Sequence, residues 1–187
     1  MRAKDLKPQF KGKLKIYLDL DGVLADFFAE YAKMAGVKPN KYGRHEYRSI
    51  PAHLKDPTLE KMIGTDFFAR LPKFPTTDAL IKMTVDSFGS YNICSSPLRN
   101  DEKNSEHYKK IWIREHLHPK PNEIIITSVK ANYAMQENGM PNILVDDRGN
   151  NIRDWELAGG LGIKYQADED PLEKVAQGYH RILKVFT

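Results

Sequence analysis

The sequence has a single cysteine, Cys94, so no disulfide can form within the chain. It has no apolar run approaching the roughly 20 residues that a membrane-spanning helix needs. It also lacks the glycine fingerprint of dinucleotide-binding proteins, the phosphate loop of P-loop proteins and the His-Glu-x-x-His spacing of zinc peptidases. The basic N-terminus has no apolar core, so we do not expect a signal peptide. These absences favour a soluble protein of the reducing cytoplasm and give no sign of a membrane, a dinucleotide or zinc.

The 187 residues carry a formal charge of +4, but this charge is unevenly placed. Residues 1–15 hold six basic side chains and one acidic side chain, and residues 16–27 hold three Asp and no base. Residues 28–75 hold nine bases and five acids, whereas residues 76–187 hold fourteen bases and sixteen acids. The surplus lies in the N-terminal tail, which argues against nucleic acid as a partner. The body instead pairs an acidic cluster with a basic segment after it.

Five short apolar runs predict buried strands, because they are rich in β-branched residues and nearly continuous. These runs are residues 15–20, 91–95, 123–128, 142–145 and 162–166. Helical patterns separate them, at residues 77–88, from 104 or 105 to before Pro119, and at 130–138, 150–158 and 171–185. Alternating strands and helices predict an α/β fold with a central parallel sheet of about five strands.

Residues 28–75 interrupt this alternation and show no strand pattern. A helix is expected over residues 26–35, then a Gly-, Pro-, Tyr- and Arg-rich stretch, a second helix near residues 58–63 and an apolar turn at 66–71. We therefore predict a basic tail at residues 1–14, a core of residues 15–27 and 76–187, and a small helical insertion at 28–75.

The strongest chemical signal is Asp19-Leu20-Asp21-Gly22, directly after the first predicted strand. Two carboxylates at a strand's carboxyl end reach the crevice where α/β sheets bind ligands. They repel each other unless a proton or cation is shared, and a hard cation such as Mg²⁺ takes oxygen ligands. Asp26, further along, is better explained as a helix cap.

A second acidic pair, Asp146-Asp147, follows another predicted strand and would bring four carboxylates around one crevice. By itself this pair is equally well explained as a turn. Ser95 and Ser96 follow the strand at residues 91–95, where hydroxyl and amide groups can bind phosphate, although a Ser-Pro turn explains them too. Lys130 would offset the charge of a phosphate and of the acids.

Cys94, within a predicted strand and without a neighbouring histidine, is expected to be a buried apolar residue rather than a nucleophile.

The order Asp-x-Asp-Gly-Val, Ser, Lys, Asp-Asp resembles the four motifs of the haloacid dehalogenase phosphohydrolase superfamily, over residues 15–166. The stretches DLDGVLADF, NICSSPL and ILVDDR are most similar to the 5′(3′)-deoxyribonucleotidases and their phage and bacterial relatives. The resemblance implies a three-layer Rossmann-like fold with a helical cap after the first strand. It also implies a Mg²⁺-dependent phosphomonoesterase acting on a small nucleotide, a deoxynucleoside 5′-monophosphate above all.

The resemblance further assigns roles to residues. Asp19 would be the nucleophile that forms an aspartyl-phosphate, and Asp21 the acid and base, with its carbonyl on the metal. Ser95, with Ser96, would hold the phosphoryl group. Lys130 would stabilise nucleophile and phosphate. Asp146 and Asp147 would hold the metal directly or through water, with Asp147 favoured as the direct ligand.

In the family that these motifs resemble, an aromatic residue after the first motif packs on the base, and the corresponding residue here is Phe27. A core role at the cap hinge explains Phe27 equally well. Tyr42, Arg44 and Tyr47 are the further candidates for substrate contact, without a clean match to the family's cap.

Two rival hypotheses stay open: a phosphatase of nucleic-acid 3′-phosphate ends or of another small metabolite, and a non-catalytic binding scaffold. The sequence also leaves a homodimer open.

Overall fold

Within residues 13–186, the part of the chain that the computed structural model describes, five parallel strands form one sheet in the order β3-β2-β1-β4-β5. The predicted tail at residues 1–14 lies almost wholly outside the described residues. All five predicted strands are confirmed, as β1 (Ile16–Leu18), β2 (Asn92–Ser95), β3 (Ile124–Ile126), β4 (Ile143–Asp146) and β5 (Leu161–Lys164). The central strand β1 places Tyr17 beside Asn92 of β2 and Leu144 of β4. The ends of β1, β2 and β4 therefore lie next to one another.

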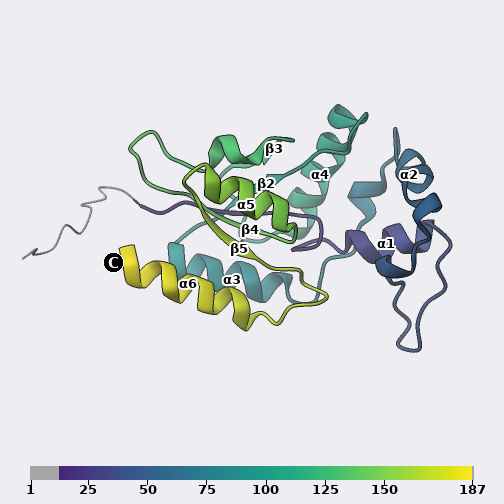
Figure 1. Cartoon of the computed structure of the whole chain (residues 1–187), viewed down its shortest axis with the longest axis horizontal. Helices are drawn as coiled ribbons and strands as arrows, with labels where there is room; N and C mark the ends of the chain where they lie inside the picture. The colour runs from purple at the N-terminus through teal and green to yellow at the C-terminus, as the bar shows by residue number, and fades with distance from the viewer. Residues whose placement is uncertain (1–12, 187) are drawn as a thin grey trace, which may run out of the picture.

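Helices cover both faces of the sheet, because successive side chains of each strand point to opposite sides. Ile16 and Leu18 belong to the larger apolar core, whereas Tyr17 belongs to a smaller one with Trp155. The larger core includes side chains of α3 (Thr77–Phe88), α4 (Glu102–His116) and α6 (Glu173–Phe186), and the smaller one those of α5 (Gly149–Leu157). Figure 1 shows α3 and α6 running along the same side of the sheet. Among residues 13–186, no helix has the length and apolar character needed to cross a bilayer.

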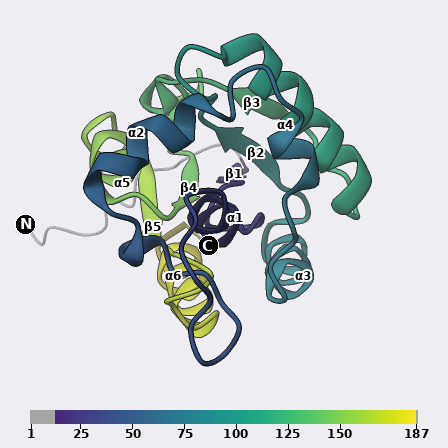
Figure 2. The same ribbon diagram turned by 90° about the vertical axis from the view of Figure 1, so that its right-hand side faces the viewer.

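The segment after β1 is helical and lies beyond the carboxyl ends of the strands (Figures 1 and 2). It holds α1 (Phe27–Met34), η1 (Tyr47–Ser49), α2 (Ala52–Glu60) and η2 (Phe67–Arg70). The chain leaves and re-enters the core side by side, because the Asp26 amide donates to the Pro72 carbonyl at 2.8 Å and the Phe74 amide to the Leu24 carbonyl at 3.0 Å. We call residues 28–75 the cap; their division from the core stays a prediction.

The helix boundaries correct three expectations. The second cap helix spans Ala52–Glu60 rather than residues 58–63, because it begins after Pro51 and accommodates Pro57 internally. α4 begins at Glu102 rather than at residue 104 or 105. The helix expected at residues 130–138 is only the short 3-10 helix η3 (Lys130–Tyr133). It ends because residues 136–140 form a turn, in which the Gln136 amide donates to the Met140 carbonyl at 2.8 Å.

Candidate active site

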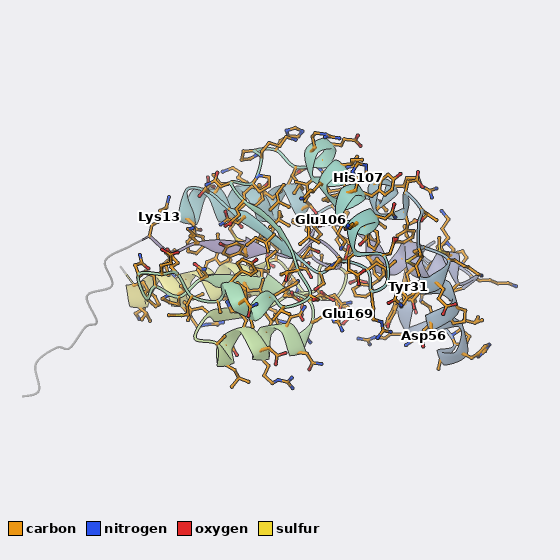
Figure 3. All side chains as sticks on the ribbon, turned by 90° about the horizontal axis from the view of Figure 1, so that it is seen from above. Lys13, Tyr31, Asp56, Glu106, His107 and Glu169 are labelled. Carbon is orange, nitrogen blue, oxygen red and sulfur yellow. The ribbon has the colours of Figure 1, made fainter. Side chains whose placement is uncertain are left out.

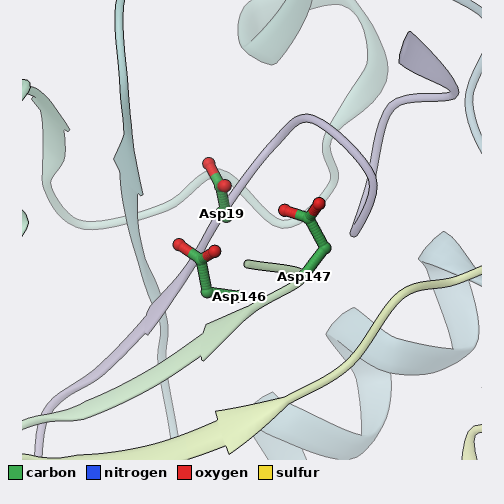
Figure 4. Close-up of side chains that lie close together, drawn as sticks. All are labelled: Asp19, Asp146 and Asp147. Carbon is green, nitrogen blue, oxygen red and sulfur yellow. The ribbon is translucent and has the colours of Figure 1, made fainter. Parts of the chain in front are cut away.

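Three carboxylates meet where β1 and β4 end. Asp19 follows β1 directly, Asp146 is the last residue of β4, and Asp147 comes next. Carboxylate oxygens of the three residues lie within 4.8 Å of one another, and all three side chains are buried (Figure 4). The parallel pairing of β1 with β4 produces this cluster, since it aligns the carboxyl ends of the two strands.

Asp19 is held in one orientation by donors on two sides. Its Oδ1 accepts from the Leu20 amide at 2.8 Å, and its Oδ2 lies 2.9 Å from Nζ of Lys130. Burial raises the pKa of the Asp19 carboxyl, but the ammonium groups of Lys130 and Lys109 outweigh burial and hold that pKa below its ordinary value. Asp19 is therefore an ionised, aligned carboxylate, as a nucleophile must be.

Asp146 is fully engaged by the protein. Its oxygens accept from Nζ of Lys130 at 2.6 Å, from the Asn151 amide group at 3.0 Å and from the Arg148 backbone amide at 2.9 Å. Lys130 thus bridges Asp19 and Asp146. The side chain of Asn151 fixes Asp146 and also lines the cavity above the acids, a contribution that the sequence does not predict.

Asp147 differs from Asp146, because its carboxylate accepts no hydrogen bond from any residue in the described part of the chain. Burial raises the pKa of Asp147, and the nearby charges of Asp19 and Asp146 raise it further, to about 8. Its oxygens are therefore free for a ligand and poorly stabilised without one. This favours Asp147 over Asp146 as a direct metal ligand.

Gly22 allows the turn after Asp21 to pack against Asp147. Its φ is +79°, in the left-handed region, and the Leu24 amide closes the turn on the Leu20 carbonyl at 2.8 Å. A Cβ at position 22 would come within 2.7 Å of the Phe28 ring and 3.0 Å of Asp147 Cγ. Any side chain there would displace the carboxylate.

Asp21 lies beside the cluster and contacts a lysine that the sequence reasoning did not single out. Nζ of Lys109, in α4, donates to Oδ2 of Asp21 and to Oγ of Ser95 at 3.2 Å, and the lysine is 1% exposed. Burial raises the pKa of Asp21 and the charge of Asp19 adds to it, which outweighs the lowering by Lys109. A carboxyl shifted in this direction suits a proton donor.

A sequence signal for Lys109 did exist. Ser105, Trp112 and Ile113 lie four residues before it and three and four after it, on one helical face, and all three are buried. A lysine on such a face needs a partner, since an unpaired buried charge is costly.

The adjacent serines have different surroundings. Ser95 is fully buried and accepts from Lys109, and its hydroxyl lowers the pKa of Asp19 through a hydrogen bond. Ser96 lines the cavity. Cys94 is buried, as expected, and burial raises its pKa to about 12.

A cavity of about 700 Å³ opens above the acids, between the core and the cap. Asp19, Asp21 and Asp147 line its floor. The opposite wall is formed by Phe27 and by the cap residues Phe28, Tyr31, Tyr47, Lys55, Asp56, Leu59 and Phe68. Figure 3 shows Tyr31 and Asp56 at the cap end of the molecule, far from Lys13. Two predicted substrate contacts, Phe27 and Tyr47, thus reach the cavity.

The structure does not bring Tyr42 or Arg44 to this cavity. Tyr42 is 81% exposed. Arg44 forms a bidentate pair with Asp26, at 2.8 and 3.0 Å, and contacts Asp168 at 2.9 Å. Asp26 also caps α1, accepting from the Ala29 amide at 3.2 Å, as expected. Arg44 therefore ties the cap to the loop after β5.

The floor of the cavity suits a divalent cation. It offers carboxylate oxygens, which hard cations prefer, and Asp147, whose carboxylate has no hydrogen-bond partner in residues 13–186, lines this space. Oδ1 of Asp21 is buried without a hydrogen-bond partner among residues 13–186. The acids exceed the lysines that pair with them, so a cation would neutralise charge that the protein leaves uncompensated.

Comparison with known proteins identifies the fold. The sequence matches no protein-family model, and no curated protein is significantly similar to it. Among solved structures, a hydrolase from Streptococcus pneumoniae matches with a TM-score of 0.52 at 11% identity, covering 92% of this chain and 100% of that one. The haloacid dehalogenase-like protein SP0104 of the same organism gives 0.49 at 13% identity, covering 94% and 99%. The haloacid dehalogenase-type hydrolase YfnB of Bacillus subtilis, bound to magnesium, gives 0.48 at 14% identity, covering 89% and 98%.

At such identities the likeness shows the fold alone. The five-stranded parallel sheet with helices on both faces is an α/β fold, and the Streptococcus pneumoniae hydrolase that matches with a TM-score of 0.52 shares it. The predicted fold class is confirmed.

Proposed function

We propose that the protein is a Mg²⁺-dependent phosphomonoesterase of the haloacid dehalogenase type, with nucleoside 5′-monophosphates, deoxynucleotides above all, as substrates. The observation that carries the proposal is one arrangement: Asp19, Asp21 and the free carboxylate of Asp147 line the floor of a cavity with an aromatic opposite wall, and two buried lysines pair with Asp19 and Asp21. The resemblance of the motifs and the fold of the matched hydrolases agree with it.

In the first step, Oδ of Asp19 attacks phosphorus while the bond from phosphorus to the nucleoside oxygen breaks. Asp21 gives its proton to the departing oxygen, for which its raised pKa is suited. Lys130 keeps Asp19 ionised and aligned, and Lys109 places a positive charge between Asp21 and Ser95, where phosphate oxygens would gather.

In the second step, Asp21 takes a proton from water, the water oxygen attacks phosphorus and the bond to Asp19 breaks, which releases inorganic phosphate. Asp19 and Asp147, with the carbonyl of Asp21, would hold the Mg²⁺ ion. When bound, the ion offsets charge on the phosphoryl oxygens. Asp146 acts through Lys130, which it orients.

The aromatic wall supports a nucleobase as the group attached to phosphate. Phe27 contacts the rings of Phe28, Tyr31 and Phe68 and lines the cavity with them. Flat apolar surfaces of this kind stack on bases of any sequence.

The test is phosphate release from a panel of ribo- and deoxynucleoside 3′- and 5′-monophosphates, with Mg²⁺ or with chelator. p-Nitrophenyl phosphate serves as a substrate without a base. We expect saturable release from 5′-monophosphates that depends on Mg²⁺. No release from any phosphomonoester in Mg²⁺ would overturn the proposal, and release from p-nitrophenyl phosphate alone would overturn its nucleotide part.

A second candidate is a substrate with another anionic group, such as a nucleic-acid 3′-phosphate end. Arg99 and Arg148 favour it, because both are exposed, line the cavity and form no ion pair with any residue of the 13–186 range. Faster release from 3′-phosphorylated oligonucleotides than from mononucleotides, lost in Arg99→Gln, would make this candidate the better one.

A further inference from the structure

The ammonium group of Lys109 is covered by an aromatic ring of the cap. Its Nζ lies 4.6 Å from the centre of the Phe68 ring, while the same atom donates to Asp21 and Ser95. An ammonium group has three donors. Here a carboxylate, a hydroxyl and a ring face surround it, and the lysine is almost fully buried. The ring thus stands where water would otherwise solvate the charge.

Phe68 is held in this place by the helix that carries Lys109. The indole nitrogen of Trp112, in α4, donates to the Leu71 carbonyl at 2.7 Å. The side-chain amide of Asn104 donates to the Thr65 carbonyl at 3.0 Å. These bonds fasten both ends of η2 to α4. Phe68 itself is 3% exposed, so its ring has little room to leave the lysine.

Comparison of the two buried lysines shows what the ring replaces. Lys130 is compensated by two carboxylates, those of Asp19 and Asp146. Lys109 forms an ion pair with one carboxylate among the described residues, that of Asp21, and has the ring of Phe68 as its remaining cover. The face of an aromatic ring attracts a cation without carrying net charge.

This difference matters for a site that receives a phosphate dianion. A second carboxylate beside Lys109 would hold the lysine firmly but would also repel the phosphate. A ring offsets part of the cost of burial and leaves the positive charge available. The geometry therefore serves anion binding better than a second acid would.

We propose that Phe68 is a positioning residue that holds the Lys109 ammonium against Asp21 and Ser95 through a cation–π contact, in place of a second carboxylate, so that its charge is available to phosphate. This inference rests on the proposed function, because it assigns the phosphate group of that reaction to Lys109.

The test replaces Phe68 with mono-, di- and trifluorophenylalanine, which keep the ring's shape but progressively weaken its attraction for a cation. We expect binding of inorganic phosphate in Mg²⁺, measured by calorimetry, to weaken stepwise by about 2- to 30-fold over the series, the range of such contacts. The value of kcat for the best phosphomonoester should fall in the same order.

The same series at Phe67 is the matched control, since Phe67 is buried in the same 3-10 helix and contacts the Phe27 and Phe68 rings. A flat Phe68 series, or an equal slope at Phe67, overturns the proposal.

A second measurement needs no catalysis. The urea midpoint of the metal-free protein should fall stepwise along the Phe68 series, and this trend should vanish in a Lys109→Met background. A trend that persists without the lysine overturns the contact. If wild type releases no phosphate from any ester but the trend depends on Lys109, the proposed function fails while the contact between ring and ammonium stands.

Discussion

The floor and the wall of the cavity are built in different ways. At the floor, Asp19 and the Lys130 and Asp146 side chains next to it are buried and fixed by bonds of 2.6 to 3.0 Å, two of which come from the backbone amides of Leu20 and Arg148. On the wall, aromatic rings such as that of Tyr47 contact one another without ion pairs among the rings, and Asp56 is exposed. A buried charge needs a partner at a fixed position, whereas an apolar wall tolerates many side chains. The comparison predicts that floor substitutions abolish chemistry and wall substitutions tune it.

The largest expected effect is that of Asp19→Asn. The amide cannot act as the nucleophile, so phosphate release should fall by about 10³-fold or more, as losses of a nucleophile do. Asp56→Asn, on the wall of the same cavity, is the matched control and should change kcat/KM by less than about 5-fold, because an exposed charge is well solvated. Steady-state phosphate release measures both, and circular dichroism checks the fold.

Turnover that survives Asp19→Asn at more than a tenth of the wild-type rate would contradict the role of Asp19. Equal losses in both variants would remove the distinction between floor and wall.

The two lysines should resemble each other in activity and differ in stability. Lys130→Met leaves two buried carboxylates without a partner, so the free energy of unfolding should fall by about 3–5 kcal/mol. Lys109→Met leaves Asp21, whose side chain is 25% exposed and faces the cavity, so the loss should be about half as large. Phosphate release should fall by about 10²- to 10³-fold in each, since each removes charge stabilisation.

Urea unfolding in chelator, with phosphate assays in Mg²⁺, measures these effects. A Lys109 variant that loses as much stability as the Lys130 variant would mean that water does not hydrate the Asp21 carboxylate that the substitution leaves unpaired. A Lys130 variant with normal turnover would mean that this lysine is purely structural.

The sequence predicts the floor far better than the wall, for a physical reason. Asp19 and Asp147 follow apolar runs directly, and parallel strands align their carboxyl ends, so local pattern and topology together place these acids. Lys109 lies in the middle of a helix, beside the exposed Lys110, and only the burial of its helical face separates the two.

In the cap, position depends on contacts between residues distant in sequence. Arg44 is one of several basic residues there, and its partner Asp168 is 124 residues away. Pattern within residues 28–75 cannot show that pairing. The same holds for Phe68, which lies on Lys109 because η2 is bonded to α4.

A smaller effect, on pH dependence, should single out Asp147. Its pKa is raised from an ordinary value near 3.8 to about 8, so between these values the folded protein binds a proton that the unfolded chain does not. Stability must then fall as pH rises, by up to about 1.4 kcal/mol per pH unit.

In chelator, the melting temperature should fall between pH 5 and 8 in wild type and fall less in Asp147→Asn. Mg²⁺ should reduce the difference between the two, because it neutralises the wild-type carboxylate. Parallel pH profiles of wild type and Asp147→Asn in chelator would contradict a raised pKa for Asp147.

The smallest effect expected is in the contacts that join the cap to the core. Arg44 contacts Asp26 and Asp168, whose side chains are mostly buried, whereas Arg48 pairs with Glu169 on the surface, where the arginine side chain is 80% exposed. Arg44→Gln should lower the free energy of unfolding by about 1 kcal/mol, and Arg48→Gln by less than about 0.5 kcal/mol. KM should rise a few-fold in Arg44→Gln, because a less firmly held cap positions its wall less well.

If Arg44 instead binds substrate, as the sequence predicts, its loss would raise KM by 10-fold or more and leave stability unchanged. Unfolding and kinetics on the same two variants therefore decide whether this basic residue of the cap belongs to recognition or to the attachment of the wall.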